Sequence, residues 1–301
     1  MQINRVPPHR GLAWLVQAAR LGLRHPRTIF GAGLLLVATL YATGLLFLVP
    51  LKFDTGSGAA DFSQLLMAAV PLFVVMVLLL PVLLGGLMHV VHEAASGRPV
   101  RARDLFAPIR EGRMRSLILL GGVQILLAAA STLIVAALAG GDYWRDYGEM
   151  VKAAMNGSVP VAPQPAHPLL LSLVQLIFNY FSTALMLFCL PLLLFARATL
   201  VDAVRDSLKA AVRNIGANML AGLLFLASVL AVTLAVSVVT AVLVVVSNAL
   251  HPLVAALLTL GVTLAYGAAL VSMLVASAYF AWRDIFGPSV RQEAGPHQIE
   301  L

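Results

Sequence analysis

The sequence predicts an all-α polytopic membrane protein, in which six transmembrane helices form three hairpins and amphipathic helices lie at the cytoplasmic interface. Hydrophobic residues make up 60% of the chain and charged residues 11%, whereas soluble domains carry about 25% charged residues. Six apolar runs contain no Asp, Glu, Lys or Arg, and each has the roughly 20 residues that cross a bilayer as a helix. Seventeen of the 20 Lys and Arg residues lie before the first run or after the second, fourth or sixth run, which would place them on one side of the membrane.

The bounds of the six runs give the expected membrane spans. These are Thr28–Val49, Leu65–Met88, Ser116–Ala139, Leu169–Phe195, Met219–Ser247 and Pro252–Phe280. The fifth is rich in valine, which favours strands in water. An open strand in lipid would leave its backbone polar groups unpaired, so we expect a helix there as well. The first run is too long for the core of a typical signal peptide, which predicts a retained span.

The basic residues set the orientation of the spans. The first 27 residues, the segments after the second and fourth runs, and the tail hold seventeen of them, and the intervening loops hold Lys52, Arg145 and Lys152. Because basic residues remain on the cytoplasmic side, both termini are expected in the cytoplasm, with the chain in the bacterial inner membrane. The expected parts are an N-terminal amphipathic helix (1–27), a transmembrane domain (28–287) and a cytoplasmic tail (288–301).

The N-terminal segment has the spacing of an amphipathic helix. Its polar face holds Arg10, Gln17, Arg20, Arg24 and Arg27, and its apolar face holds Leu12, Leu15, Val16, Ala19 and Leu23. Such a helix is suited to lying in the plane of the headgroups, with Trp14 as an interfacial anchor. Pro26 is expected to end or kink the helix before the first span.

The segment after the fourth span repeats this pattern. An apolar stripe of Val201, Val204, Leu208, Val212 and Ile215 lies opposite Asp202, Arg205, Asp206, Lys209 and Arg213. Anionic headgroups are the expected partners of the basic residues on both helices, at about 1 kcal/mol for each Lys or Arg. The residues proposed to contact headgroups are Arg20, Arg24, Arg27, Lys209 and Arg213. The alternative is that these charges act only as topology signals during insertion.

A weak internal repeat supports the division into three hairpins. Arg103–Phe106, Arg205–Leu208 and Arg283–Phe286 each begin with Arg-Asp and each follow an even-numbered span. We interpret the unit as a basic interfacial helix plus a transmembrane hairpin. Among the outer loops, residues 140–168 stand out, because Tyr143 and Tyr147 belong to a helical spacing that Asn156-Gly157 would stop.

Two groups of polar residues are candidates for a functional site. Gln124, Gln175 and Asn179 lie within spans three and four, and they could either line a solute path or hydrogen-bond across a helix pair. The sequence favours the second interpretation, because no ionisable residue accompanies them. His89, His92 and Glu93 cluster at the end of the second span. They are weak metal-ligand candidates, since they match no metalloprotease motif and polar residues commonly gather at such helix ends.

The sequence argues against most catalytic classes. It contains no P-loop, no dinucleotide-binding fingerprint, no set of intramembrane protease residues and no soluble catalytic domain, so we expect neither an enzyme nor a cofactor. The net charge of +7 does not indicate nucleic acid binding, because the basic residues sit beside membrane spans. The single cysteine, Cys189, lies within the fourth span and is expected to be a buried apolar residue.

The residues at the beginning of the chain support a resemblance to a known family. Val6-Pro7-Pro8-His9-Arg10-Gly11-Leu12-Ala13-Trp14-Leu15, the prolines of the even spans (Pro81 and Pro191) and the Arg-Asp motifs resemble an uncharacterised family of bacterial six-span membrane proteins. The layout is more distantly similar to the membrane domain of some glycerophosphodiester phosphodiesterases. Neither resemblance implies an activity. The expected function is therefore a non-enzymatic scaffold, or a subunit that binds lipid or a partner and that forms a homo-oligomer or joins another membrane protein. The alternative is a facilitator or exporter of a small or lipophilic solute.

Overall fold

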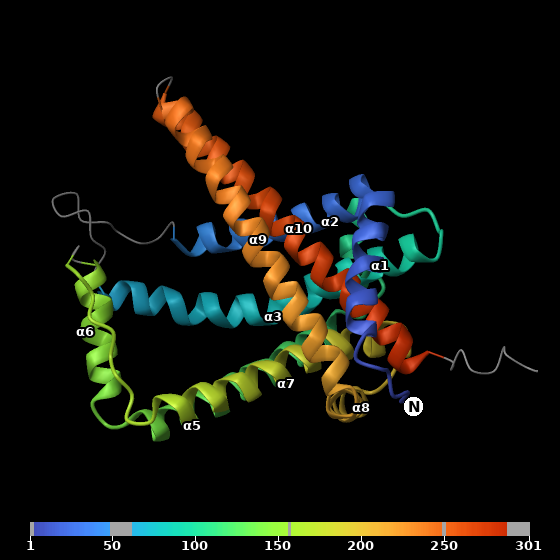
Figure 1. The fold of residues 1–301 in the computed structure, drawn as a ribbon, viewed down its shortest axis with the longest axis horizontal. Coiled ribbons are helices and arrows are strands. Elements are labelled where there is room, and N and C mark those ends of the chain that lie inside the picture. Colours follow the sequence, from blue (N-terminus) through green and yellow to red (C-terminus); the bar gives the residue numbers. More distant parts are fainter. Residues whose placement is uncertain (1–2, 49–61, 156–157, 249–250, 288–301) are drawn as a thin grey trace, which may run out of the picture. The chain divides into compact units, whose positions relative to one another are not determined.

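All regular structure is helical in the computed structural model, which describes residues 3–48, 62–155, 158–248 and 251–287 (Figure 1). The elements in chain order are α1 (Arg10–Arg24), α2 (Pro26–Leu48), α3 (Phe62–Ala95), the 3-10 helix η1 (Ala102–Phe106), α4 (Ala107–Arg110), α5 (Met114–Ala139), α6 (Tyr143–Met155), α7 (Pro168–Leu194), α8 (Leu200–Arg213), α9 (Ile215–Asn248) and α10 (Pro252–Phe286).

Within the described residues, six helices are long and apolar enough to cross a membrane. They are Pro26–Phe47, Met67–Ala95, Met114–Ala139, Pro168–Leu194, Ile215–Ser247 and Pro252–Phe286. The predicted all-α, six-span class is confirmed, and the valine-rich α9 is a helix, as the lipid argument requires. Helices α3 and α10 are longer than the spans expected within them, because α3 continues past Met88 to Ala95 and α10 continues past Phe280 to Phe286. An apolar run marks where the hydrocarbon ends, whereas helical hydrogen bonding continues into the polar interface.

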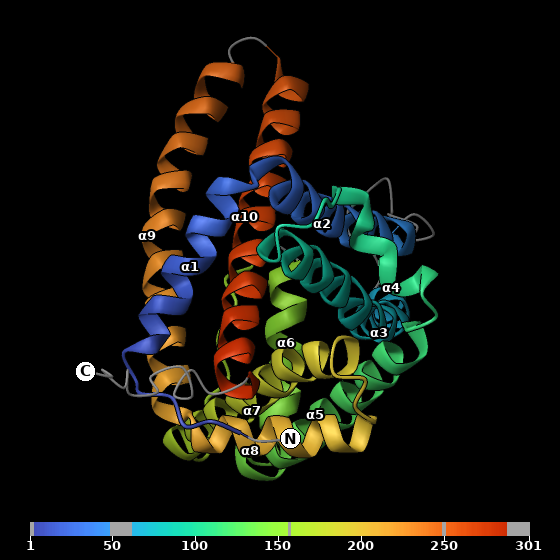
Figure 2. The ribbon, with the colours of Figure 1, turned by 90° about the vertical axis from the view of Figure 1, so that its right-hand side faces the viewer.

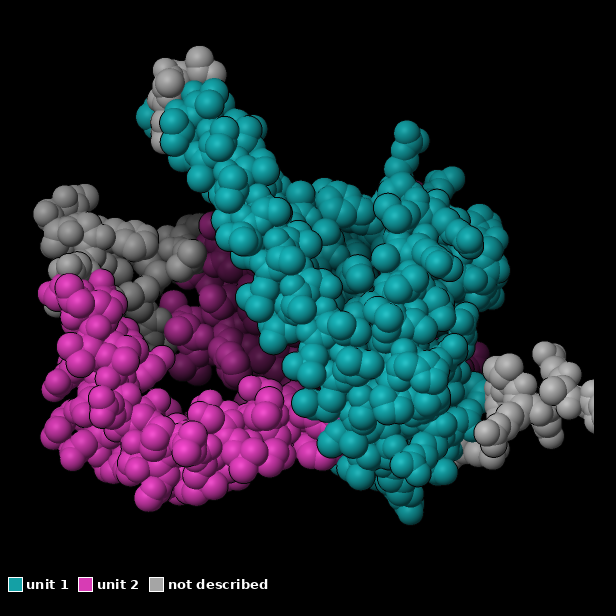
Figure 3. Space-filling model, viewed as in Figure 1, with its two compact units in different colours: residues 1–34, 90–102, 201–301 teal, residues 35–89, 103–200 magenta. Residues whose placement is uncertain are grey.

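The chain divides into two compact units, which Figure 3 shows in different colours. Unit 1 comprises residues 1–34, 90–102 and 201–301, and unit 2 comprises residues 35–89 and 103–200. The amphipathic α1 therefore belongs to the same unit as the last two spans, although the sequence set it apart as a separate N-terminal part. The predicted tail, 288–301, lies outside the described residues.

Unit 1 is built on an antiparallel pair of long helices, α9 and α10, and α1 lies across both of them (Figure 2). Two glycines allow the backbones to approach closely. A Cβ atom at Gly11 of α1 would lie 2.6 Å from the carbonyl oxygen of Ala217 in α9, and one at Gly33 of α2 would lie 2.8 Å from that of Ala268 in α10. Helices that meet within a membrane commonly use such small residues at their contact.

The junction between α1 and α2 confirms the predicted role of Pro26. Helix α1 ends at Arg24, His25 adopts a non-helical conformation, and Pro26 is the first residue of α2. Proline suits this position because the first amide of a helix has no intrahelical acceptor in any case.

Unit 2 contains the paired helices α5 and α7. Arg113, one residue before α5, donates hydrogen bonds to the carbonyls of Leu193 (3.2 Å) and Leu194 (2.9 Å) at the end of α7. The last carbonyls of a helix have no intrahelical donor, so this guanidinium completes the C-terminus of α7. One of the basic residues that the sequence assigned to the cytoplasmic side thus has a structural role.

The predicted short helix in the long outer loop is present as α6. Its aromatic edge consists of Tyr143, Trp144 and Tyr147, whose rings lie 5.6 to 6.4 Å apart between centroids. Residues 159–165 form no regular structure, as their prolines predict. The predicted Asn156-Gly157 stop lies outside the described residues, and α6 ends at Met155.

Candidate functional site

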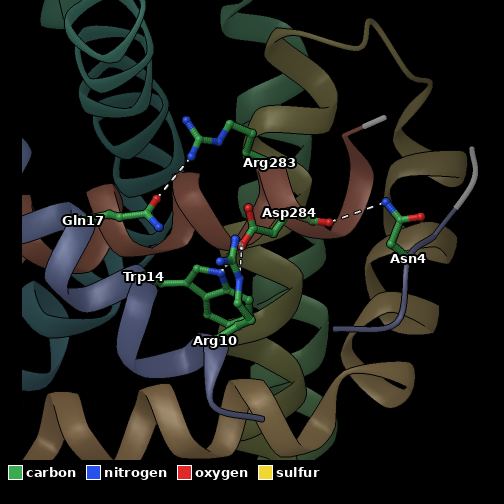
Figure 4. A network of polar contacts seen from close by, with 6 residues as sticks. All are labelled: Asn4, Arg10, Trp14, Gln17, Arg283 and Asp284. Atoms are coloured by element: carbon green, nitrogen blue, oxygen red, sulfur yellow. Dashed lines mark hydrogen bonds and ion pairs between the residues drawn. The ribbon is translucent and has the colours of Figure 1, made fainter. Parts of the chain in front are cut away.

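A polar network joins α1 to the end of α10, with the Asp284 carboxylate at its centre (Figure 4). Oδ2 of Asp284 accepts hydrogen bonds from Arg10 Nη2 at 2.6 Å and Arg10 Nε at 3.1 Å. The same oxygen accepts a hydrogen bond of 2.8 Å from the indole nitrogen of Trp14. The Asp284 side chain is 13% exposed and that of Arg10 is 39% exposed, so the ion pair is shielded on one side and open on the other.

The segment before α1 adds backbone contacts to this network. The Asn4 amide nitrogen donates to the carbonyl of Ile285 at 2.8 Å, and its side chain donates to that of Gly287 at 2.9 Å. Asn214, between α8 and α9, accepts from the Val6 amide at 2.8 Å and donates to the Asn4 carbonyl at 3.1 Å. The N-terminal segment is therefore bonded both to the end of α10 and to the α8–α9 junction.

The predicted role of Trp14 as an interfacial anchor is wrong. Its side chain is 1% exposed and packs inside unit 1. A buried tryptophan needs an acceptor for its N–H, and Asp284 supplies one. The sequence alone does not show that an acceptor for the indole N–H lies near the other end of the chain. Trp14 was therefore expected at the membrane surface.

Helix α1 has three faces where the sequence indicated two. The buried face consists of Gly11, Trp14, Leu15, Ala18 and Leu21. Leu12, Val16 and Leu23, which were assigned to a single apolar face with Leu15, are instead exposed, Leu23 by 81%. Arg20 and Arg24 form an exposed basic face. The helix thus packs on the protein with one face and presents an apolar and a basic face outward.

Helix α8 has the same design. Its buried face consists of small residues, Ala203, Ser207, Ala210 and Ala211, whereas the predicted apolar stripe exposes Val201, Leu208 and Val212. Lys209 and Arg213 are exposed on the charged face. At about 100° per residue, the buried, apolar and charged faces follow one another in the same rotational order in α1 and α8. A division of each helix into one polar and one apolar half does not reveal this shared order.

A pocket of about 280 Å³ opens beside the basic face of α1 within unit 1. Its lining consists of Gln17, Arg20, Leu21 and Arg24 from α1, Ala95 from the end of α3, and Phe280 and Arg283 from α10. Arg283 Nη2 donates to Gln17 Oε1 at 3.2 Å, which Figure 4 shows. The Arg283 guanidinium also lies 4.9 Å from the centroid of the Phe280 ring. Both contacts fix a long cationic side chain.

The pocket sorts the predicted headgroup residues. Arg20 and Arg24 line it, whereas Lys209 and Arg213 are exposed on α8. The placement of Arg27 on the polar face of α1 is wrong, because α1 ends at Arg24 and Arg27 is an exposed residue at the start of α2. Sequence reasoning missed Arg283 as a site residue, although it found the Arg-Asp motif that contains it. In that motif Asp284 faces Arg10 and Trp14, and Arg283 faces the pocket, so two adjacent residues have different roles.

Two residues of the histidine cluster, His92 and Glu93, contact other side chains of the protein. Nε2 of His92 lies 3.0 Å from Arg98 Nη2 and Nδ1 lies 3.2 Å from the hydroxyl of Tyr279. Because a guanidinium only donates, Nε2 accepts, which leaves the proton on Nδ1 to be donated to Tyr279. Glu93 pairs with Arg98 at 2.8 Å. His89 lies one helical turn earlier on α3. The described residues include no group of three His, Cys, Asp or Glu arranged to hold a metal ion.

The polar residues of the third and fourth spans take different positions. Gln124 of α5 donates to the Ser182 carbonyl at 3.2 Å and accepts from the Ser182 hydroxyl at 2.6 Å. Gln175 and Asn179 of α7 are exposed. The reciprocal Gln124–Ser182 contact is the helix-pair hydrogen bond that the sequence favoured over a solute path.

Comparison of the chain with protein-family models, with curated proteins and with solved structures gives no match.

Proposed function

We propose that this protein is a non-enzymatic scaffold, or a lipid- or partner-binding subunit, of the bacterial inner membrane, with both termini in the cytoplasm. The orientation follows from the seventeen basic residues on one side of the spans. In this proposal α1, α8 and Arg27 at the start of α2 form a cytoplasmic collar, a name we use for these parts lying in the headgroup layer. The resemblance to six-span bacterial proteins is compatible with such a role and adds no activity to it.

The observation that carries the proposal is the pair of outward faces on α1. The Asp284 contacts with Arg10 and Trp14 fix this helix on α10, while Leu23 and Arg24 remain exposed on two adjacent faces. An interfacial helix buries an apolar face at the boundary of headgroups and acyl chains and places its basic face among the headgroups. Topology signalling requires the charges but neither this phasing nor the docking.

The facilitator or exporter remains the second candidate, and it requires a continuous polar path through the spans. Gln124 and Ser182 satisfy each other's hydrogen bonds, which favours a closed helix contact at this point of α5 and α7. The scaffold proposal is therefore preferred.

The experiment that tests the collar compares thermal unfolding of the purified protein in neutral and anionic bilayers. A triple variant, Arg27→Gln, Lys209→Gln and Arg213→Gln, removes basic residues that do not line the pocket. We expect anionic lipid to stabilise the parent, and the stabilisation to fall in the triple variant by about 1 kcal/mol for each charge removed, as for juxtamembrane basic residues.

Arg145→Gln is the matched control, because Arg145 is exposed on α6, within the long outer loop between α5 and α7. Its response to anionic lipid should equal that of the parent when the lipid is confined to the cytoplasmic leaflet. If the triple variant responds to anionic lipid as strongly as the parent, the collar proposal fails.

A further inference from the structure

We infer that the pocket lined by Arg20, Arg24 and Arg283 binds one phosphate group, supplied by the headgroup of an anionic phospholipid. This inference rests on the proposed membrane-surface position of α1, and it deepens that proposal by naming a single site and its ligand class. The collar alone requires only a diffuse attraction between basic helices and an anionic surface. The pocket geometry points to stoichiometric binding.

The positive charge of the pocket favours an anionic ligand. Three of its seven lining residues are arginines and none is acidic. Across the described residues, no ion pair joins Arg20, Arg24 or Arg283 to a carboxylate. Asp284, adjacent to Arg283 in sequence, is already paired with Arg10. Three cations around one small volume repel one another, and an anion placed between them relieves that repulsion.

The guanidinium groups of the pocket favour phosphate as that anion. The guanidinium group carries five N–H donors in a planar fork that matches phosphate oxygens two at a time. Arg283 uses one nitrogen for Gln17, and its remaining donors are sufficient for a bidentate contact with phosphate. Such charge-assisted pairs are roughly twice as strong as neutral hydrogen bonds.

Arg283 is held in place before a ligand binds. The Gln17 contact and the Phe280 ring hold Arg283 before a ligand arrives. Immobilising a long side chain on binding costs conformational entropy, and this cost is already met within the protein. Gln17 thus acts as a positioning residue, because its amide oxygen accepts from Arg283 and would repel a phosphate oxygen at the same point.

The walls and surroundings of the pocket favour a lipid as the source of the phosphate. Leu21, Ala95 and Phe280 supply apolar lining, against which a glycerol backbone can pack. The volume of about 280 Å³ is just below the range of about 300–1,000 Å³ that is usual for small-molecule pockets, so it suits a headgroup rather than a whole lipid. Leu23, exposed on the adjacent face of α1, provides apolar surface for the acyl chains.

The test measures binding of short-chain phosphatidylglycerol to the full-length protein in a neutral detergent by titration calorimetry. We expect saturable binding at one site per chain. Arg283→Gln and Arg24→Gln should each weaken it by about tenfold or more, as expected for loss of a charged hydrogen-bonding partner. The matched control is Arg145→Gln, which removes an exposed arginine of α6 outside the pocket and should leave the affinity unchanged.

Two further variants separate binding from folding. Arg283→Lys keeps the charge without the planar fork and should weaken binding less than Arg283→Gln. Gln17→Leu keeps all three arginines and should weaken binding because Arg283 is no longer held. Circular dichroism and the unfolding temperature in neutral detergent show whether each variant is folded. If folded Arg283→Gln binds as tightly as the parent, the inference is wrong.

Two additional ligands identify the source of the phosphate. Short-chain phosphatidylcholine should bind at least about tenfold more weakly, because its choline cation meets three arginines; equal binding would overturn the anion site. Inorganic phosphate should bind more weakly than phosphatidylglycerol, since it lacks the apolar contacts. Equal phosphate affinity would keep the phosphate chemistry and overturn the lipid source. Absence of one-site binding while anionic bilayers still stabilise the parent would reject the pocket and leave the collar standing.

Discussion

The indole N–H of Trp14 donates a hydrogen bond of 2.8 Å to the carboxylate of Asp284, which lies 270 positions further along the chain. The oxygen that accepts it also accepts two hydrogen bonds from Arg10. An isolated buried carboxylate is costly, and here a cation and a neutral donor compensate it together. This contact fixes α1 on α10, and it determines which side chains of α1 remain exposed.

Replacement of Asp284 should therefore release α1. In Asp284→Asn, Arg10 and Trp14 lose their charged acceptor, and we expect a loss of about 1–3 kcal/mol in unfolding free energy, the cost of leaving buried polar groups poorly satisfied. The loss in unfolding free energy is limited because the Arg10 side chain is 39% exposed and can hydrogen-bond to water instead. Reversible chemical unfolding in detergent measures it.

Asp142→Asn is the control for this prediction. Asp142 pairs with Arg145 at 3.2 Å, but both side chains are largely exposed, 79% and 67% respectively. Exposed pairs contribute about 0–1 kcal/mol, so this variant should remain close to the parent. Equal effects of the two substitutions would show that the Asp284 network does not hold α1.

Gly11 and Gly22 of α1 form a matched pair for a second test. A Cβ atom at Gly11 would lie 2.6 Å from the Ala217 carbonyl oxygen, whereas one at Gly22 would have no neighbour within 4 Å. Gly11→Ala should separate α1 from α9 and destabilise the protein by about 1–3 kcal/mol, the usual cost of overpacking. Gly22→Ala should instead stabilise the helix by up to about 1 kcal/mol, because alanine is the better helix former.

Thermal unfolding of both glycine variants measures the difference. A small, equal effect of the two changes would contradict the close packing of α1 on α9. Bromide- or nitroxide-based quenching adds an independent readout, because loosening of α1 exposes Trp14 to a quencher.

The third prediction concerns the contact between α5 and α7. Gln124→Leu removes both hydrogen bonds of this contact, whereas Ser182→Ala removes the one from the Ser182 hydroxyl and leaves the backbone carbonyl that accepts from Gln124. A contact of this kind in a membrane contributes about 0.6 kcal/mol on average. The double variant should cost less than the sum of the two single variants, because each of them already removes the shared interaction.

Gln175→Leu is the control, since Gln175 is exposed on α7 and should change the unfolding free energy little. Additive effects of Gln124→Leu and Ser182→Ala would mean that the two side chains act separately. The helix-pair interpretation would then lose its support relative to a polar path.

The spans were predictable from the sequence because they depend on local composition, and so were the helix break at Pro26 and the short helix α6. The faces of α1 and α8 were not. A helical wheel gives the angular position of a residue, but hydrophobicity does not distinguish a protein neighbour from a lipid neighbour. In α8 the small Ala203 and Ala210 are buried, and the larger Val201 and Val212 are exposed. Small residues permit close helix contact within a membrane, whereas large apolar residues gain equally from lipid.

The pocket was out of reach of the sequence for a related reason. Its arginines come from the first and last described helices, and local pattern carries no information about which distant faces meet. The repeated Arg-Asp motif gave the nearest signal. Its three copies take different positions, namely a 3-10 helix, the middle of α8 and the last turn of α10, so the motif alone did not indicate which copy contributes to a pocket.

The last prediction concerns orientation, which decides the leaflet that the pocket faces. Ser96, just after α3, and Ser158, beyond α6, are exposed. We expect them on opposite sides of the membrane, because one candidate span, α5, lies between them in the sequence. Cysteine introduced at Ser158 should react with a membrane-impermeant maleimide on intact spheroplasts, and cysteine introduced at Ser96 should react only after permeabilisation. The native thiol of Cys189 is fully buried, so the unsubstituted protein supplies the background. Labelling of Ser96→Cys alone on intact spheroplasts would show the opposite topology, with Arg20, Arg24 and Arg283 at the outer leaflet. Labelling of both positions would indicate mixed insertion. In either case the cytoplasmic collar would be rejected, whereas one-site phosphate binding in detergent would be judged on its own titration.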